Sequence, residues 1–362
     1  MKPVRIGLGA AAIGLAALGG LAGYAAERHL VGRLRAGEDP EAGEPFGRLP
    51  GRHRVVLADD GVPLHVEEVG PDDAPLTVVF CHGYVFESAS WHYQRRDLAE
   101  LISRPVRLVV YDQRSHGRSG RSPVEACTID QLGRDLAIVL HEVVPTGPVV
   151  LVGHSMGGMT IMALADQRPE LFDGDRVLAV ALVSTSAGRL AELTFGLPAA
   201  FGEVKNWVLP HLARGVRANP RIADQTRRLA GDLPFLLTRR FGFGSAPVAP
   251  SLVEFVERMV EQTPSEVVAA FFDSFVNHDK LAALPVLDGV ETLILAGEDD
   301  LVTPADHARS IAESVPQGRL VVLPGAGHNV MLERHSDVTG ELADLVERAW
   351  ARRERARVAS GA

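Results

Sequence analysis

Cysteine is scarce in this sequence, with two among 362 residues, and no run of five or more basic residues occurs. Cys81 and Cys127 cannot build a disulfide framework, so we expect both to be free thiols. The Cys-His spacing typical of zinc sites is also absent, and we predict neither a metal nor a cofactor. A net charge of −9 without basic tracts makes nucleic acid a poor candidate partner.

Charge is also missing from one long stretch near the start of the chain, residues 6–26. As a helix, these 21 residues would extend about 31 Å, enough to cross a hydrocarbon core of about 30 Å. The alternative is a cleaved signal peptide, whose apolar region is usually only about 7–15 residues long. We therefore expect residues 1–36 to anchor the protein in a membrane, on a side that flanking charges do not settle, or to direct its secretion. Residues 37–51, rich in Gly, Pro and Glu, are predicted to be a linker.

The rest of the chain alternates apolar strand patterns with helical ones, and 46% of all residues are hydrophobic, enough for a large core. Strands are predicted at residues 54–58, 63–69, 77–81, 107–111, 149–152, 178–184, 292–296 and 320–323. The first two are joined by Asp59-Asp60-Gly61, a hairpin signal, and Thr128-x-x-Gln131 is a capping box that opens a helix. Apolar strands separated by helices predict an α/β fold with a mostly parallel eight-stranded sheet and helices on both faces. The core would comprise residues 52–186 and 286–350, with a tail at 351–362.

One interval, residues 187–285, has no clear strand pattern. Helical patterns recur there at residues 251–262 and 267–276, and the second follows a predicted capping box at Thr263 to Glu266 with proline at the first helical position. The interval also holds nine of the 13 phenylalanines. We predict an inserted helical lid, because such insertions commonly close catalytic pockets.

A nucleophile elbow is the most informative motif. The apolar run at residues 149–152 ends in Gly153-His154-Ser155-Met156-Gly157, and a helical pattern follows at once. This order of strand, sharp turn and helix would expose Ser155 at the C-terminal edge of the sheet. Glycine tolerates the backbone angles and the close packing that such a turn requires.

A serine hydroxyl needs a base within hydrogen-bond reach, and the base needs an acid that orients it. His328 follows the last predicted strand in a glycine-rich loop, which places it at the same edge of the sheet. Asp299 and Asp300 follow the strand before it, and both qualify chemically as the acid, although either could instead form the turn or cap a helix.

With these motifs the chain resembles the α/β-hydrolase superfamily, in its serine esterase and lipase branch. The matching segments are Phe80 to Tyr84, Asp112 to Ser119, Gly153 to Gly158, Gly297 to Pro304, and Gly325 to His328. In the family pattern the acid stands three residues after the glycine and four before the proline, which selects Asp300. The resemblance also implies an oxyanion hole made by the backbone N–H groups of Tyr84 and Met156. Ser115 replaces a glycine of the pattern.

The resemblance implies a hydrolase that cleaves carboxylic esters through an acyl-enzyme on Ser155, with a small-molecule ester or a lipid as substrate. The serine argues against epoxide hydrolases and haloalkane dehalogenases, which use aspartate in this family. Thioesterases, cofactor-free perhydrolases and acyltransferases share the triad and stay open as alternatives, as does a catalytically silent binding protein. We expect four further polar residues near the elbow to brace loops, and Trp91 to pack under the oxyanion loop. The four are His82, Asp112, His116 and His154.

Overall fold

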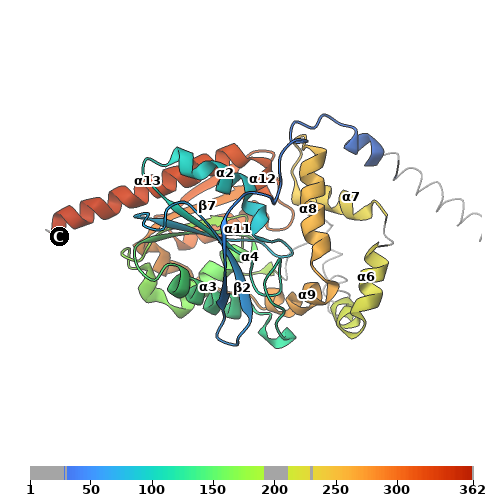
Figure 1. The fold of residues 1–362 in the computed structure, drawn as a ribbon, viewed down its shortest axis with the longest axis horizontal. Helices are drawn as coiled ribbons and strands as arrows, with labels where there is room; N and C mark the ends of the chain where they lie inside the picture. Colours follow the sequence, from blue (N-terminus) through green and yellow to red (C-terminus); the bar gives the residue numbers. More distant parts are fainter. Residues whose placement is uncertain (1–27, 29–30, 191–210, 229–230, 361–362) are drawn as a thin grey trace, which may run out of the picture.

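The computed structural model describes residues 28, 31–190, 211–228 and 231–360. Within these ranges eight strands form one sheet, in the order β1-β2-β4-β3-β5-β6-β7-β8 (Figure 1). The strands are β1 (Arg52–Leu57), β2 (Pro63–Val69), β3 (Thr77–Cys81), β4 (Arg107–Tyr111), β5 (Val149–His154), β6 (Val177–Val183), β7 (Glu291–Gly297) and β8 (Arg319–Leu323). β2 pairs antiparallel with both β1 and β4, and all other neighbours are parallel. The predicted mostly parallel eight-stranded sheet is confirmed.

The central strands separate two apolar layers. Every residue of β3, β5 and β6 is buried, as expected for parallel strands covered on both faces. Successive side chains point to opposite faces, so Val78 and Phe80 join one core cluster and Val79 and Cys81 join the other. Both predicted free thiols are buried and unpaired.

Helices cover both faces of this sheet. The helices of the described ranges include α2 (His92–Leu101), α3 (Ile129–Val143), α4 (Met156–Gln167), α6 (Pro220–Arg228), α7 (Leu233–Gly242), α8 (Pro250–Gln262), α9 (Ser265–Ala270), α10 (Phe272–Val276), α11 (Ala305–Ser314), α12 (Val330–Glu333) and α13 (His335–Ser360). α2, α12 and α13 pack in the first cluster, and α3, α4 and α11 in the second. α13 continues to Ser360, so the boundary predicted between core and tail at residue 350 falls inside one helix.

Helices α6 to α10 lie in the chain between β6 and β7, and we call this insertion the lid (Figure 1). The pattern at residues 251–262 forms α8, whereas the capping box predicted at Thr263 is wrong. The Thr263 hydroxyl donates to the carbonyl of Val85, and Pro264 is the N-cap, without a side-chain cap bond. The helix expected at residues 267–276 is split into α9 and α10 at Phe271. A tertiary contact to the oxyanion loop has taken the hydroxyl that the cap required.

The capping box predicted before α3 forms in part. Thr128 accepts a hydrogen bond from the backbone N–H of Gln131 at 3.1 Å, as an N-cap should. The Gln131 side chain instead donates to Asp59 and Asp135, so it does not reach back to the cap.

Residues 31–51, which we call the strap, pack on both core and lid. Phe46 stacks on Phe255 of α8 with ring centroids 4.6 Å apart, and Glu44 lies 2.7 Å from the His92 ring nitrogen of α2. Asp39 accepts from the Ser251 hydroxyl at 2.8 Å. The segment predicted as a linker, residues 37–51, therefore packs on the folded body, because its side chains find partners on two neighbouring helices.

The predicted membrane segment, residues 6–26, lies outside the described residues. In the ranges that the structure describes, no helix combines the length and the apolar character needed to cross a bilayer.

Candidate active site

Ser155 stands on a strained turn between β5 and α4. Its φ is 51° and its ψ is −117°, a combination that a non-glycine residue rarely adopts. A Cβ at Gly157 would overlap the carbonyl of Cys81, and one at Gly153 would lie 2.5 Å from the backbone of Gly157. The two glycines of the motif are therefore required by packing. The turn is held by a hydrogen bond of 2.9 Å from the Ser155 amide to Val183.

The three predicted triad residues meet at the C-terminal edge of the sheet. Ser155 Oγ lies 3.0 Å from His328 Nε2, and His328 Nδ1 lies 2.8 Å from Asp300 Oδ2. Asp299 points elsewhere and accepts a hydrogen bond of 3.0 Å from the Ser245 amide, and the hydrogen bonds from Ser245 lower the pKa of Asp299. Of the two candidate acids, Asp300 is the one that contacts the histidine.

Asp300 is held by more donors than the histidine alone. One oxygen accepts from the amides of Val302 and Thr303, both at 2.8 Å, and the other accepts from the Thr303 hydroxyl at 2.9 Å. These donors fix the orientation of the carboxylate, so that one of its oxygens faces His328 Nδ1. Sequence reasoning missed Thr303, although the pattern Asp-x-x-Thr is typical of a turn closed by a side chain.

The two predicted oxyanion donors flank the serine. Met156 is the first residue of α4, so its N–H lies at a helix N-terminus, where developing negative charge is stabilised. Tyr84 lies in the loop after β3. Among the described residues neither amide donates a hydrogen bond to a protein acceptor. A Cβ at Gly83 would lie 2.6 Å from the His154 ring, so the oxyanion loop also depends on glycine for its approach to the elbow.

His82 and Gln113 connect the oxyanion loop to the loop after β4. The Gln113 amide donates to His82 Nε2 at 2.8 Å, and the Gln113 side chain donates to the His82 carbonyl at 2.7 Å. Burial lowers the pKa of His82 to about 4, so the ring is neutral near pH 7 and can accept this bond. His82 braces the loop, as predicted.

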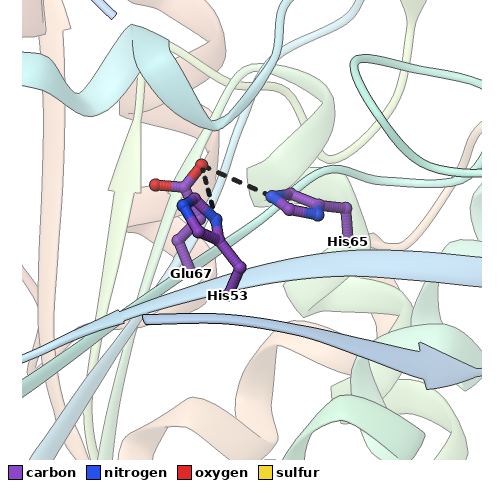
Figure 2. A group of neighbouring side chains, drawn as sticks. All are labelled: His53, His65 and Glu67. Atoms are coloured by element: carbon purple, nitrogen blue, oxygen red, sulfur yellow. Dashed lines mark hydrogen bonds and ion pairs between the residues drawn. The ribbon is translucent and has the colours of Figure 1, made fainter. Parts of the chain in front are cut away.

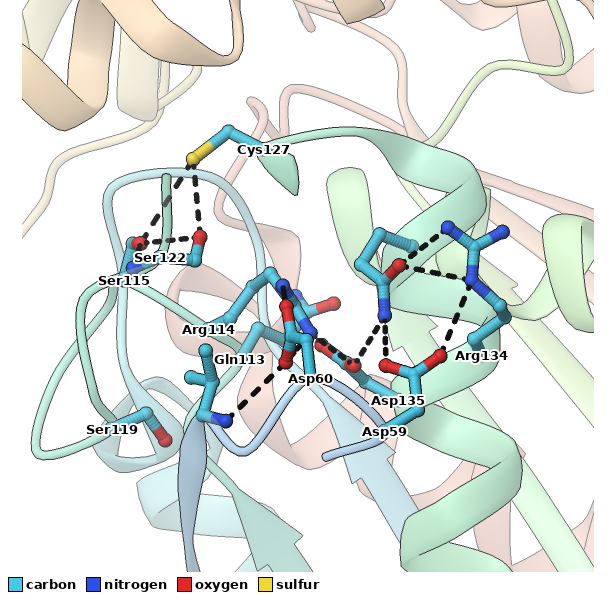
Figure 3. A network of polar contacts seen from close by, with 12 residues as sticks. Asp59, Asp60, Gln113, Arg114, Ser115, Ser119, Ser122, Cys127, Arg134 and Asp135 are labelled. Atoms are coloured by element: carbon cyan, nitrogen blue, oxygen red, sulfur yellow. Dashed lines mark hydrogen bonds and ion pairs between the residues drawn. The ribbon is translucent and has the colours of Figure 1, made fainter. Parts of the chain in front are cut away.

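A buried ion network holds the loop after β4 (Figure 3). Arg114 is fully buried and bonds Asp135 of α3 at 2.6 Å and Asp60 of the β1–β2 hairpin at 2.7 Å. The loop, the hairpin and α3 are thereby joined through one guanidinium. Ser115 has a φ of 66°, the left-handed conformation that glycine adopts most easily, which explains why the family pattern has glycine there.

Two further residues hold the loop that carries His328. His154 Nε2 lies 3.0 Å from the His328 carbonyl, and burial keeps the pKa of His154 well below its usual range, so this nitrogen donates from a neutral ring. Glu333 accepts from the amides of Gly327 at 2.7 Å and Gly244 at 3.0 Å. One carboxylate therefore joins the histidine loop to the lid. Sequence reasoning missed Glu333, for which no motif gave a signal.

The lid covers the site. Phe271 of the lid packs with Met156 and Met159 in an apolar cluster, and the Tyr84 hydroxyl donates to the carbonyl of Val268. Ser155 is only 8% exposed and His328 only 7%. Trp91 packs tilted against Phe80 and edge-on to His154, with ring centroids 5.1 and 6.4 Å apart.

A cavity of about 670 Å³ lies beside the acid of the triad. Its lining comes from α7 and the loops after α7 and β7: Leu236, Arg239, Arg240, Phe243, Gly244, Ser245, Glu298, Asp299, Asp300 and Leu301. The end of α7 and the acid of the triad therefore line the same cavity.

One cluster in the described residues has the ligand types of a metal site (Figure 2). His53 and His65 lie 3.7 and 3.4 Å from the same Glu67 oxygen. Arg118 contacts this oxygen and Arg95 bonds the other at 2.7 Å, so two guanidinium groups already neutralise the carboxylate. They would also repel a cation. We read the cluster as an ion-pair network between β1, β2 and their neighbours.

The sequence profile of the alpha/beta hydrolase fold family matches residues 77–335. The chain belongs to this family, and it is an enzyme of the α/β-hydrolase type. It is 27% identical over 286 residues to the sn-1-specific diacylglycerol lipase ABHD11 of Mus musculus, covering 79% of this chain and 84% of the lipase.

Two other similarities cover most of the chain. The non-heme chloroperoxidase of Burkholderia pyrrocinia is 26% identical over 305 residues, covering 80% of this chain and 97% of the relative. The solved structure of a thermophilic esterase from Thermogutta terrifontis superposes with a TM-score of 0.64 at 25% identity, covering 82% of this chain and 99% of the esterase.

Proposed function

We propose that the protein is a serine hydrolase that cleaves carboxylic esters through an acyl-enzyme on Ser155. The observation that carries the proposal is the relay of 3.0 and 2.8 Å from Ser155 through His328 to Asp300, built on a strained elbow. Such a relay is the arrangement that a weak hydroxyl nucleophile needs.

In this mechanism His328 Nε2 takes the proton of Ser155 as Oγ attacks the ester carbonyl. The amides of Tyr84 and Met156 stabilise the oxyanion of the tetrahedral intermediate. His328 then gives its proton to the leaving alcohol, and the acyl group stays on Ser155. Water, deprotonated by the same histidine, attacks the acyl-enzyme and releases the acid. Asp300 holds the imidazole in the tautomer with the proton on Nδ1 and stabilises the imidazolium.

The substrate that we propose is an ester with an apolar acyl chain, of a small molecule or a lipid. Support comes from the apolar cluster of Met156, Met159 and Phe271 beside the serine. The relatives named above include a diacylglycerol lipase and an esterase, which act on this class of bond. We also propose that residues 6–26 hold the protein at a membrane, a proposal that rests on their lack of charge.

A serine-reactive fluorophosphonate tests the proposal directly. The intact protein should be labelled and should hydrolyse a graded series of p-nitrophenyl esters, whereas Ser155→Ala should lose both activities. Ser186→Ala is a matched control, because Ser186 Oγ also lies 2.7 Å from a histidine nitrogen, that of His307. This control should keep both activities. Labelling that follows Ser186 instead would refute the assignment.

The alternatives predict other results in the same assays. Acyl transfer would favour an added alcohol over water, a thioesterase would prefer acyl thioesters, and a perhydrolase would form peracid from acetate and hydrogen peroxide. A binding protein on this scaffold would show neither labelling nor turnover.

A further inference from the structure

Positive charge is concentrated in one part of the lid, although the whole chain carries a net charge of −9. Residues 211–240 contain seven arginines and two aspartates, with no glutamate or lysine. This local excess of five positive charges favours an anionic surface as partner.

Large apolar side chains are exposed on the same helices. On α7, Leu233 and Leu237 are 46% and 47% exposed, and Arg240 is exposed on the same stripe at i, i+4 and i+7 spacing. The opposite side of α7 buries Phe235. On α6, Ile222 is exposed beside an exposed arginine. A stripe with leucines and arginine on one helix face is typical of helices that lie on a bilayer surface.

The strap fixes where the proposed membrane segment joins the folded body. Arg35 bonds Asp232 at 3.1 Å, at the start of α7, and its guanidinium lies 4.8 Å from the ring centroid of Phe235. Val31 is buried in the core cluster that contains Phe235. Ala26 precedes Val31 by five residues, and five residues span at most about 18 Å. A membrane segment that ends at Ala26 therefore keeps the start of the strap close to the bilayer.

We propose that α6 and α7 dock on an anionic lipid bilayer through Leu233, Leu237, Arg240, Arg221 and Ile222. The proposal rests on the proposed hydrolase and on its membrane segment. In this orientation Leu233 and Leu237 contact lipid, while Leu236, Arg239 and Phe243 of the same segment line the cavity beside Asp300. Arg240 belongs to both, because it is exposed on the stripe and also lines the cavity. An ester in the bilayer would then reach the triad along α7 without crossing bulk water.

A second basic surface of the same molecule is an alternative candidate for binding the anionic bilayer. The end of α13 carries Arg352, Arg353, Arg355 and Arg357, and Val358 is 82% exposed there. Figure 1 shows this end of α13 at the opposite side of the molecule from α6 and α7. Charge alone would favour both surfaces, whereas the strap and the leucine stripe favour only α7.

The test uses the full chain in vesicles of phosphatidylcholine, with or without phosphatidylglycerol. Cys81 and Cys127 are buried, so Leu237→Cys and Val358→Cys each provide one accessible thiol for an environment-sensitive fluorophore. Lipids with a quencher on the acyl chain should quench the label at position 237 several times more strongly than the label at 358. The difference should need phosphatidylglycerol and should shrink at high salt.

Charge reversal provides the second arm. Arg221→Glu with Arg240→Glu should abolish most of the quenching at position 237, whereas Arg352→Glu with Arg353→Glu should leave it unchanged. Equal quenching at both labels, stronger quenching at 358, or quenching independent of phosphatidylglycerol would overturn the docking proposal. If the protein failed to float with any of the vesicles, the membrane segment on which the docking proposal rests would be refuted, and the docking proposal with it. Hydrolysis of a soluble p-nitrophenyl ester, measured in parallel, shows whether the proposed function stands in either case.

Discussion

Replacing Asp300 by asparagine should remove most of the catalytic rate while leaving the fold intact. The geometry dictates how the new amide sits. Its oxygen must still accept from the amides of Val302 and Thr303, which both bond the same Asp300 oxygen at 2.8 Å. The NH₂ group is therefore directed at His328 Nδ1. That nitrogen must then accept, so the ring proton moves to Nε2, which faces Ser155.

A histidine in this tautomer cannot take the serine proton, and no carboxylate remains to stabilise an imidazolium. In serine hydrolases of the triad type this change lowers kcat by about 10⁴-fold. That factor corresponds to about 5 kcal/mol of activation free energy. We therefore expect Asp300→Asn to retain about one part in 10⁴ of kcat on a p-nitrophenyl ester, with an unfolding midpoint close to that of the parent protein.

Asp299→Asn is the matched control, because it makes the same chemical change one residue away. The Asp299 carboxylate accepts a hydrogen bond of 3.0 Å from the Ser245 amide, and an asparagine oxygen can accept that bond. A surface change of this kind alters the free energy of unfolding by about 0.5 kcal/mol or less. Because Asp299 bonds none of the triad residues, we expect kcat to stay within about twofold of the parent value. If Asp300→Asn kept a tenth of its activity, or if Asp299→Asn were the more damaging change, the proposed relay would be refuted.

Three further predictions concern stability. Arg114→Met should lower the free energy of unfolding by about 3–5 kcal/mol, because it leaves a buried carboxylate unpaired. Urea unfolding measures this change, and a loss below about 1 kcal/mol would contradict the buried network. Phe46→Ala should lower the free energy of unfolding by about 1–2 kcal/mol, because it removes the half-buried ring that stacks on Phe255. An unchanged melting temperature would show that this contact does not hold the strap. Burial lowers the pKa of His82 to about 4 and that of His116 to about 3, from 6.5. Below pH 6.5 the unfolded chain therefore takes up protons that the folded protein does not, and each histidine should cost about 2 kcal/mol of stability at pH 5. His116→Asn should reduce the loss of stability between pH 7 and pH 5. If the variant and the parent protein lost the same amount of stability over this range, the lowered pKa of His116 would be refuted.

The sheet and the triad could be predicted because short-range patterns determine them. A buried parallel strand is a continuous apolar run, and the residue that follows it must lie at the edge of the sheet. Ser155, Asp300 and His328 each follow such a run, so their meeting follows from topology. The choice of Asp300 over Asp299 came from the family spacing, since both carboxylates fit the local chemistry.

What could not be predicted depends on partners far away in the chain. Thr263 looks like a helix cap until its neighbour Val85, 178 positions earlier, is known. Residues 37–51 have the composition of a linker, because they are rich in Gly, Pro and Glu. Only the positions of α2 and α8 in the fold show that Glu44 and Phe46 contact these helices. Composition predicts how a segment behaves alone, and both segments are held by tertiary contacts.

The carboxylate of Glu333 has a consequence for how the lid can move. It bonds the amides of Gly244 in the lid and of Gly327 beside the catalytic histidine. A Cβ at Gly327 would lie 2.5 Å from the Gly244 nitrogen, so the backbones of the two loops are in direct contact. Lifting the lid at this corner would displace the base from the serine. Substrate entry that preserves a competent enzyme must therefore leave the contact between Gly244 and Gly327 in place, and a ligand that separated them would act as an inhibitor without touching Ser155.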